Sequence, residues 1–171
     1  MPNPLPLVIY PNSILRTVTI DLATADASIY IGLAEAMGKT MEQAKGVGLA
    51  AVQVNQLVRL AVINKEVAGS VNHLALLNPC ITWHSWRHTI DEEGCLSLPG
   101  VFGDVRRHTS IEISYMKLDG TISTFKARGL LARVLQHEID HLDGVLFIDR
   151  TLRIKQGQNF LDQWNQLISR A

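Results

Sequence analysis

The middle of the chain is a block of strand-like segments with helical segments on either side. In residues 109–127, TSIEISYMKLDGTISTFKA, apolar side chains alternate with polar ones before Asp119-Gly120 turns the chain and a second alternating run returns. This pattern predicts a β-hairpin. Residues 57–64 (LVRLAVIN) and 73–79 (HLALLNP) also read as strands. Strand and helix do not alternate as a parallel sheet requires, so the order of segments predicts an α+β fold.

Three segments have helical character. Residues 26–46 carry apolar side chains at roughly helical spacing, with Asp26 as a candidate N-cap. Residues 129–144, GLLARVLQHEIDHLDG, read as a second helix that ends at Gly144. Residues 158–170 (QNFLDQWNQLISR) are expected to form a C-terminal helix.

The composition is that of an ordinary globular domain. The 171 residues, 47% apolar and 19% charged, suit a single domain that spans residues 1–171. A chain of this length buries roughly 70% of its unfolded surface, so it needs no disulfide to fold. Sixteen basic and sixteen acidic residues give a formal net charge of zero. This balance argues against a dedicated nucleic-acid-binding protein.

The sequence contains no signal for export or membrane insertion. The first residues, MPNPLPLVIYPNSILR, lack a basic segment that leads into an apolar one. No apolar run approaches the ~20 residues that span a bilayer. The two cysteines, Cys80 and Cys95, form no disulfide framework. We therefore expect a reducing, cytoplasmic location, or an organelle after import if the source is eukaryotic.

The segment QHEIDHLDG, residues 136–144, contains an HExxH motif. At about 100° per residue, His137 and His141 project from one face of a helix about one turn apart. Glu138 lies beside them, where it can reach a water on the metal without binding the ion. A catalytic divalent ion usually takes three protein ligands, so the motif predicts a metal site that needs a third ligand.

Apolar side chains flank the histidines on the predicted helix. Val134 and Leu130 fall on the same stripe as the histidines, one and two turns from His137 toward the N-terminus. An apolar wall beside a metal indicates a substrate with an apolar side chain. Leu131, Leu135 and Leu142 lie on the neighbouring face and are expected in the core.

The third ligand is expected upstream of the motif. Many HExxH peptidases take it from a downstream glutamate or histidine. After His141 this chain contains neither residue type, and only aspartates remain: Asp143, Asp149 and Asp162. The upstream candidates are His73, His84, His88, His108, Cys80 and Cys95.

Cys95, in the segment EEGCLSLPG, is the preferred candidate. A thiolate binds zinc or ferrous iron strongly. Gly94 allows a close backbone approach, and Pro99-Gly100 turns the chain afterwards. Taken alone, Cys95 could equally be a buried free thiol. Cys80, among strand-like apolar residues, is expected to be a small buried hydrophobic residue.

The segment GVGLAAVQV, residues 46–54, matches the G-x-G-x-x-A dinucleotide fingerprint. That fingerprint requires a preceding strand and a following helix. Here a helix precedes the segment and strand-like sequence follows, so we reject nucleotide binding. The small residues instead indicate a backbone that approaches a ligand and presents the amide of Gln53, although an ordinary packed turn would have the same residues.

Together, GVGLAAVQV, EEGCLSLPG and QHEIDHLDG resemble the three motifs of the peptide deformylases, in order and in approximate spacing. YPNSILR (10–16) and LFIDR (146–150) also look like family sequence. The resemblance covers nearly the whole chain. It implies antiparallel β-sheets packed around a central helix that carries HExxH, with a C-terminal helix of the bacterial type.

The resemblance also implies the reaction and its metal. The family removes the formyl group from the N-terminal formylmethionine of newly made proteins and releases formate. Cys95, His137 and His141 would bind one divalent ion, expected to be Fe²⁺, with Zn²⁺, Ni²⁺ or Co²⁺ as alternatives. Glu138 would take a proton from water and deliver it to the leaving amine.

The remaining residue roles are implied in the same way. Gln53 and the backbone N–H of Leu96 would stabilise the oxyanion of the tetrahedral intermediate. Backbone groups near three residues would hold an extended peptide like an added strand, namely Val47, Gly48 and Gly94. Leu130 and Val134 would line the methionine pocket. The implied partners are therefore N-formylmethionyl nascent peptides.

Two features depart from the family pattern. Many members carry an arginine at the position of Phe102. Members thought to dock on the ribosome often have a basic tail, whereas residues 151–171 contain only Arg153, Lys155 and Arg170 as bases. A tail this weakly basic gives little support for ribosome association, which the resemblance leaves open.

Two other functions stay open from the sequence. An HExxH endopeptidase would use Asp149 or Asp162 as its third ligand and would tolerate loss of Cys95. A non-catalytic paralogue would bind metal or formyl-peptides and release no formate.

Overall fold

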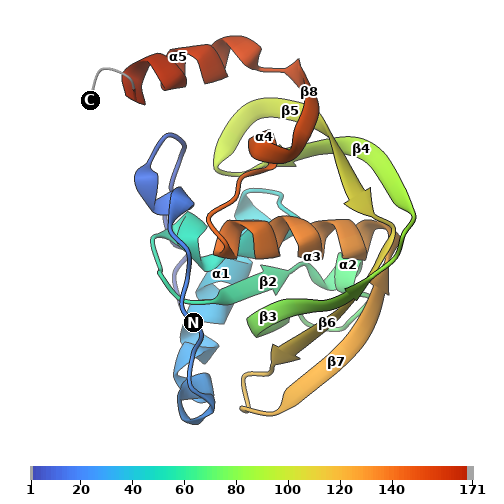
Figure 1. Ribbon diagram of the computed structural model, residues 1–171. Helices are drawn as coiled ribbons and strands as arrows, with labels where there is room; N and C mark the ends of the chain where they lie inside the picture. The colour runs from blue at the N-terminus through green and yellow to red at the C-terminus, as the bar shows by residue number, and fades with distance from the viewer. Residues whose placement is uncertain (1, 169–171) are drawn as a thin grey trace.

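The computed structural model describes residues 2–168 as two antiparallel sheets with the helix α3 (Gly129–Leu142) between them (Figure 1). Strands and helices occur in blocks, and each strand pairing in both sheets is antiparallel. The predicted α+β class, the antiparallel sheets around a central helix and the C-terminal helix are confirmed.

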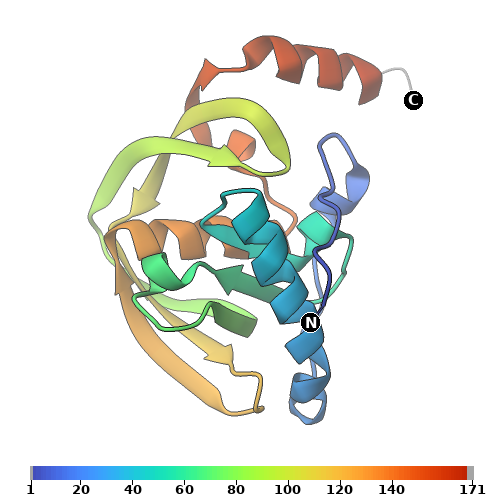
Figure 2. The same ribbon diagram turned by 180° about the vertical axis from the view of Figure 1, so that it is seen from behind.

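The larger sheet has five strands in the order β1-β2-β3-β6-β7. Their bounds are β1 Gly48–Ala50, β2 Leu60–Ile63, β3 Leu74–His84, β6 Ser110–Met116 and β7 Ile122–Arg128. Helix α1 (Ile31–Gln43) and α3 cover opposite faces of this sheet (Figures 1 and 2). Alternate residues of β2 enter the two cores: Leu60 and Val62 pack with α1, whereas Ile63 packs with α3.

The predicted hairpin is the pair β6–β7, which pairs Met116 with Ile122 at the turn. Gly120 has φ +84°, which favours glycine. Ile111, Ile113 and Tyr115 are all buried, in agreement with the alternation in the sequence.

The smaller sheet has three strands in the order β4-β5-β8. Their bounds are β4 His88–Cys95, β5 Leu98–His108 and β8 Thr151–Gln156. The sequence did not predict these strands as such. The first five residues of β4 are exposed, so β4 lacks the apolar alternation that marks a half-buried strand.

The start of helix α1 differs from the prediction, whereas the end of helix α3 agrees with it. A 3₁₀ segment, Thr24–Tyr30, precedes α1, so the Asp26 backbone lies inside a turn and does not cap the helix. Helix α3 ends as predicted: Gly144 has φ +71°, and Val145 N donates to Asp140 O at 2.8 Å. Short helices α2 (Lys65–Ala68) and α4 (Phe147–Arg150) were not predicted.

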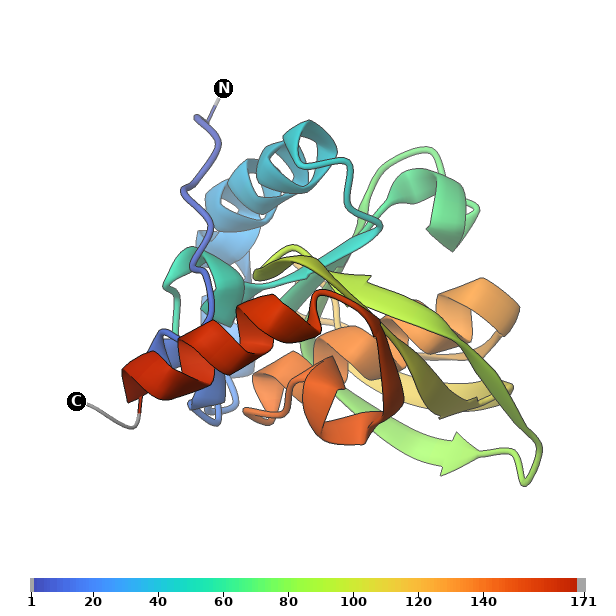
Figure 3. The same cartoon turned by 90° about the horizontal axis from the view of Figure 1, so that it is seen from above.

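The C-terminal helix α5 (Gln158–Ile168) lies against the N-terminal segment (Figure 3). Tyr10 makes an edge contact with Trp164, with ring centroids 5.8 Å apart, and its hydroxyl donates to Asn165 Oδ1 at 2.9 Å. Leu161 joins a core that also contains Leu98 from the smaller sheet.

The expectation for Cys80 was wrong, because its side chain is exposed. Asn78 has φ +48°, and the pairing of β3 with β6 shifts register between Leu77 and Cys80. The apolar neighbours in the sequence therefore do not predict which way Cys80 points. Among residues 2–168, no helix is long and apolar enough to cross a bilayer.

Candidate metal centre and active site

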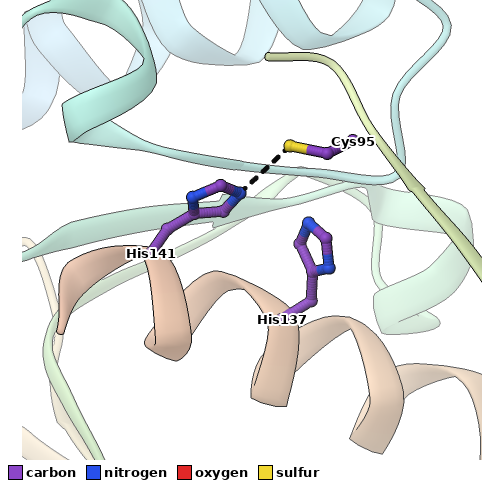
Figure 4. Close-up of side chains that lie close together, drawn as sticks. All are labelled: Cys95, His137 and His141. Carbon is purple, nitrogen blue, oxygen red and sulfur yellow. Dashed lines mark hydrogen bonds between the residues drawn. The ribbon is translucent and has the colours of Figure 1, made fainter. Parts of the chain in front are cut away.

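Three side chains from two elements meet at the centre of the molecule (Figure 4). His137 and His141 rise from α3 one helical turn apart, and Cys95 reaches toward them from the end of β4. Their ligand atoms all lie within 4.8 Å of one another, and Cys95 Sγ is 3.2 Å from His141 Nε2. The structure thus brings together the three residues that the sequence nominated as metal ligands.

Cys95 is held in place by a tight connection between β4 and β5. Cys95 pairs with Leu98, and Leu96-Ser97 forms the turn between them. Leu98 is fully buried in the core beside α4. The strand end and its anchored neighbour therefore fix the thiol relative to α3.

Glu138 is buried beside the ligand group. Its side-chain Oε2 has no hydrogen-bond partner among the described residues. Burial raises the pKa of Glu138 to about 7. The carboxylate lies against Gly48, where a Cβ would collide with both Glu138 and Val134. The absence of a side chain at Gly48 therefore makes room for the carboxylate at the pocket wall.

Glu93 orients His137 and was not found from the sequence. Its Oε2 lies 3.0 Å from His137 Nδ1, so this nitrogen donates and Nε2 stays available as a ligand. Arg107 donates to both Glu93 oxygens at 3.0 and 2.9 Å, and Arg133 donates to Glu93 Oε1 at 2.6 Å. Burial raises the pKa of Glu93, but the hydrogen bonds from His137 and Arg107 outweigh it and hold that pKa well below its usual range.

The same ionic cluster extends across α3. Arg107 also donates to Asp140, which accepts two hydrogen bonds from Arg150 at 2.6 and 2.7 Å. Arg107 and Asp140 are both buried. No short motif reveals this cluster, because its members come from β4, β5, α3 and α4.

Gln53 faces Cys95 from the 3₁₀ turn Ala51–Val54 that follows β1. Its Oε1 accepts from Ala50 N at 2.8 Å, which fixes the amide orientation. Its Nε2 donates to Cys95 Sγ at 3.4 Å and to Ser97 Oγ at 3.2 Å. Gln53 therefore reaches the ligand group.

The N-terminal segment holds the Gln53 turn and the Cys95 turn at a fixed spacing. Val8 N donates to Gln53 O at 2.8 Å, and Tyr10 N donates to Ser97 O at the same distance. Val8 and Tyr10 lie two residues apart on one extended segment, so their hydrogen bonds connect the two turns.

A pocket of about 450 Å³ opens beside the ligand group. Its lining includes the remaining residues nominated from the sequence: Val47, Gly48, Gln53, Gly94, Leu96, Leu130, Val134 and Glu138. Val134 is 5% exposed and lies deep, whereas Leu130 is 58% exposed and lies at the rim. Phe102 also lines the pocket, and its ring covers Gly94, where a Cβ would meet it at 2.6 Å.

The other candidate ligands lie elsewhere. Asp149 pairs with Arg16 and accepts from Leu146 N at 2.8 Å. Asp162 is exposed and accepts from Gln158 at 2.9 Å. His73 lies 3.0 Å from Glu42. Within residues 2–168, the set that could hold an ion is the group of Cys95 and the two HExxH histidines.

Comparison with known proteins agrees with this geometry. The family model described as Polypeptide deformylase matches residues 4–157. The chain belongs to the polypeptide deformylase family. A peptide deformylase from Rhizobium meliloti is 41% identical over 152 residues, which cover 88% of this chain and 87% of that protein.

Solved structures of the family share the fold. The peptide deformylase from Thermotoga maritima has a TM-score of 0.81 and 33% identity, covering 88% of this chain and 99% of that chain. An actinonin-bound class I type b peptide deformylase from Acinetobacter baumannii has a TM-score of 0.80 and 33% identity, covering 86% of this chain and 98% of that chain. Peptide deformylases are metal-dependent enzymes that remove the formyl group from N-terminal methionine.

The residues present fit a divalent metal. One thiolate and two imidazoles suit Zn²⁺ or Fe²⁺. Glu93 fixes the His137 ring, and Gln53 donates toward the Cys95 sulfur. Glu138 Oε2, which is buried and has no hydrogen-bond partner among the described residues, lies near these three ligands but is not one of them. The donor set therefore matches a catalytic site with three protein ligands.

Proposed function

We propose that residues 1–171 form a single catalytic domain that hydrolyses the N-formyl group of formylmethionyl nascent peptides and releases formate. The observation that carries this proposal is the convergence of Cys95, His137 and His141 beside the buried carboxylate of Glu138. Family membership supports the reaction class.

The three ligands would hold one divalent ion, proposed to be Fe²⁺, with Zn²⁺, Ni²⁺ or Co²⁺ as alternatives. When bound, such an ion supplies a Lewis acid that polarises oxygen and lowers the pKa of water. Glu93 keeps His137 in the tautomer that offers Nε2 as a ligand. Metal analysis of protein purified without air would identify the ion.

Glu138 would move the proton that the hydrolysis requires. It accepts a proton from water as the water oxygen bonds to the formyl carbon. It returns that proton to the amine nitrogen when the carbon–nitrogen bond breaks, so formate and a free amino terminus result. Burial keeps Glu138 out of bulk water, and the pKa of about 7 suits a group that both accepts and donates.

Gln53 and Leu96 would stabilise the negative charge on the formyl oxygen. The Gln53 amide is held at both ends, by Ala50 and by Ser97, so its plane is oriented before substrate arrives, and the Nε2–H now directed at Cys95 Sγ is the one that would meet the formyl oxygen. The Leu96 backbone N–H belongs to the turn next to Cys95. Donors fixed in advance need no reorganisation during the reaction.

The pocket would bind the first residue and the peptide backbone. Leu130 and Val134 offer apolar area to the methionine side chain. Backbone groups near Val47, Gly48 and Gly94 line the same pocket and would pair with an extended peptide.

We propose a cytoplasmic location and no nucleic-acid partner. Ribosome association through the tail is not part of the proposal. Arg153 pairs with Asp104 at 3.0 Å, and Lys155 pairs with Glu92 at 3.0 Å, so neither base is left to contact another molecule without breaking an ion pair. Arg170 lies outside the described residues.

A formate-release assay tests the function. Formyl-Met-Ala is incubated with protein loaded with iron under anaerobic conditions, and formate is measured alongside cleavage of an unformylated peptide. We expect formate and no internal cleavage. Internal cleavage would instead identify an endopeptidase, and metal binding without either product would identify a non-catalytic paralogue.

A further inference from the structure

A second groove, of about 650 Å³, lies on another face of α3 and shares no lining residue with the catalytic pocket. Its walls come from the ends of β3, β4 and β5 together with α3 and α4. The polar groups that matter are His84, His88, His108, Arg106, Arg150 and Asp140. Neither the proposed hydrolysis nor the metal centre uses the three histidines or Arg106.

The three imidazoles form one contiguous group, called the stack below, in which His108 is stacked on His84 with ring planes 26° apart and is tilted by 37° against His88. The His108 ring contacts His84 with centroids 3.9 Å apart and His88 with centroids 4.3 Å apart. His108 Nδ1 lies 2.7 Å from the carbonyl oxygen of Ser85, so this nitrogen donates and Nε2 is the one left for another molecule. Since His84 ends β3 and His88 begins β4, the stack sits where the two sheets join.

The groove carries more positive than negative charge. Arg106, Arg107 and Arg150 line it, against the single lining carboxylate of Asp140, and Arg107 is also paired with Glu93. Asp140 is already shared by Arg107 and Arg150. Arg106 has no carboxylate within 4.0 Å in the described part of the chain, and its contact is a 3.4 Å approach to His88 Nδ1. Arg106 is therefore an exposed guanidinium with its donors available.

The environment of His108 agrees with a positive potential. Burial lowers the pKa of His108, and the charges of His84, His88 and Arg106 lower it further, although the hydrogen bond to Ser85 raises it. An anion in the groove would relieve this repulsion. A cation would add to it.

The geometry disfavours a metal ion. Ring nitrogens bind metals along directions that lie in the ring plane, and the His108 plane is inclined by 26° to that of His84 and by 37° to that of His88. Across residues 2–168, the three imidazoles are not among the sets whose ligand atoms converge on one point. A guanidinium beside the stack also repels a cation.

We propose that this groove binds a phosphate-type dianion, with Arg106 and the exposed histidines His84 and His88 as its principal ligands. A guanidinium can donate two parallel hydrogen bonds to such an oxyanion. His108 Nε2 and Arg150 line the same groove, although Arg150 already donates to both oxygens of Asp140. The ion could be free phosphate or the terminal phosphate of a small phosphate monoester.

Calorimetric titration at neutral pH and constant ionic strength tests the site. Inorganic phosphate is titrated into the metal-loaded protein and into the variants Arg106→Gln and His88→Gln. We expect saturable binding with one site, and a loss of affinity of at least about tenfold in Arg106→Gln, because hydrogen bonds to charged groups are worth that much. Glycerol phosphate is titrated as the second ligand. If it binds more tightly than inorganic phosphate, the natural ligand is a phosphate monoester; if the two bind equally, the natural ligand is the free phosphate ion.

Arg87→Gln is the matched control. Arg87 is exposed in the connection between β3 and β4, but it does not line the groove. Its variant removes the same charge nearby and should change the affinity less than twofold. Equal losses in Arg87→Gln and Arg106→Gln, no saturable binding of either phosphate, or titration of the histidine signals in NMR spectra by Zn²⁺ and not by phosphate would each overturn the proposal.

Discussion

Glu93 accepts a hydrogen bond from His137 Nδ1 at 3.0 Å while both of its oxygens are held by Arg107. One proposed metal ligand is thereby tied to a buried ionic cluster that crosses α3. The carboxylate cannot turn away from the imidazole without breaking its contacts with the two arginines, Arg107 and Arg133.

Glu93→Gln should weaken both the metal site and the fold. An amide cannot neutralise Arg107 and Arg133, and breaking a buried ion pair from one side typically costs ~3–5 kcal/mol of unfolding free energy. Loss of a partner that orients a metal ligand typically lowers metal affinity by roughly 10–100-fold. Denaturant unfolding and metal titration measure the two effects.

Glu92→Gln is the control for this change. Glu92 is the neighbouring residue, is exposed and pairs with Lys155 at 3.0 Å. An exposed ion pair contributes about 0–1 kcal/mol, so Glu92→Gln should leave metal affinity unchanged. Equal metal affinity in Glu93→Gln and Glu92→Gln would show that Glu93 does not orient His137.

Cys95→Ser should lose most of the activity or change the metal preference, because serine oxygen is a harder and less acidic ligand than a thiolate. In the wild type a thiolate ligand should lie about 2.3 Å from zinc. The measurements are metal content per chain and formate release with each metal. Cys80→Ser, at the exposed second cysteine, should match the wild type. Full iron-dependent activity in Cys95→Ser would remove the thiolate from the mechanism.

Glu138→Ala should keep the metal and lose proton transfer, with turnover lower by at least ~100-fold. Glu138 lies outside the group of converging ligand atoms, so metal content should stay near that of the wild type. Glu138→Gln keeps the shape of the side chain against Gly48 and should be equally slow. If either variant lost its metal, Glu138 would have to be a ligand.

Phe102→Arg should affect binding of short peptides without changing the chemical step. The Phe102 ring lies over Gly94 at the pocket, 37% exposed, and offers apolar area alone. An arginine there could pair with a peptide's terminal carboxylate, and an exposed pair of this kind changes affinity by at most about fivefold. We expect a modestly lower KM for formylated di- and tripeptides with a free carboxylate.

Amidated versions of the same peptides serve as the control for Phe102→Arg, because they lack the charge that an arginine would meet. Their KM should change little. An equal change for acids and amides, or a large drop in turnover, would mean that Phe102 shapes the catalytic centre directly.

The sequence predicted the elements whose signals are local. The alternation around Ile113 and the Asp119-Gly120 turn identified the hairpin, and helical spacing placed His137 and His141 on one face of α3. Elimination of downstream ligands left six upstream candidates, and the affinity of a thiolate for zinc or iron favoured Cys95, which the structure brings to that face. These predictions needed only the period of a helix or strand and, for Cys95, the chemistry of metal ligands.

The rest depended on contacts between distant segments. The first five residues of strand β4 are exposed, so the strand lacks the hydrophobic alternation that would have revealed it. Glu93 and Arg133 are 40 residues apart and read as surface charges until the fold buries them together. Cys80 was misplaced for the related reason that an irregular pairing of β3 with β6, absent from any local pattern, decides which way it points.

The division of the proposed ligands between the smaller sheet and helix α3 has a consequence for how the protein matures. Cys95 belongs to the smaller sheet, whereas α3 packs its apolar stripe on the larger one. A chain in which only the smaller sheet has folded therefore has the thiol in place without the histidines. A chain in which only the larger sheet and α3 have folded has the histidines in place without the thiol. Tight metal capture must wait until the two halves have closed on α3, and from then on the ion would resist their separation, because a ligand that binds only the native state stabilises it. In a misassembled copy the three proposed ligands would not meet, so that copy would bind the ion weakly and would be inactive.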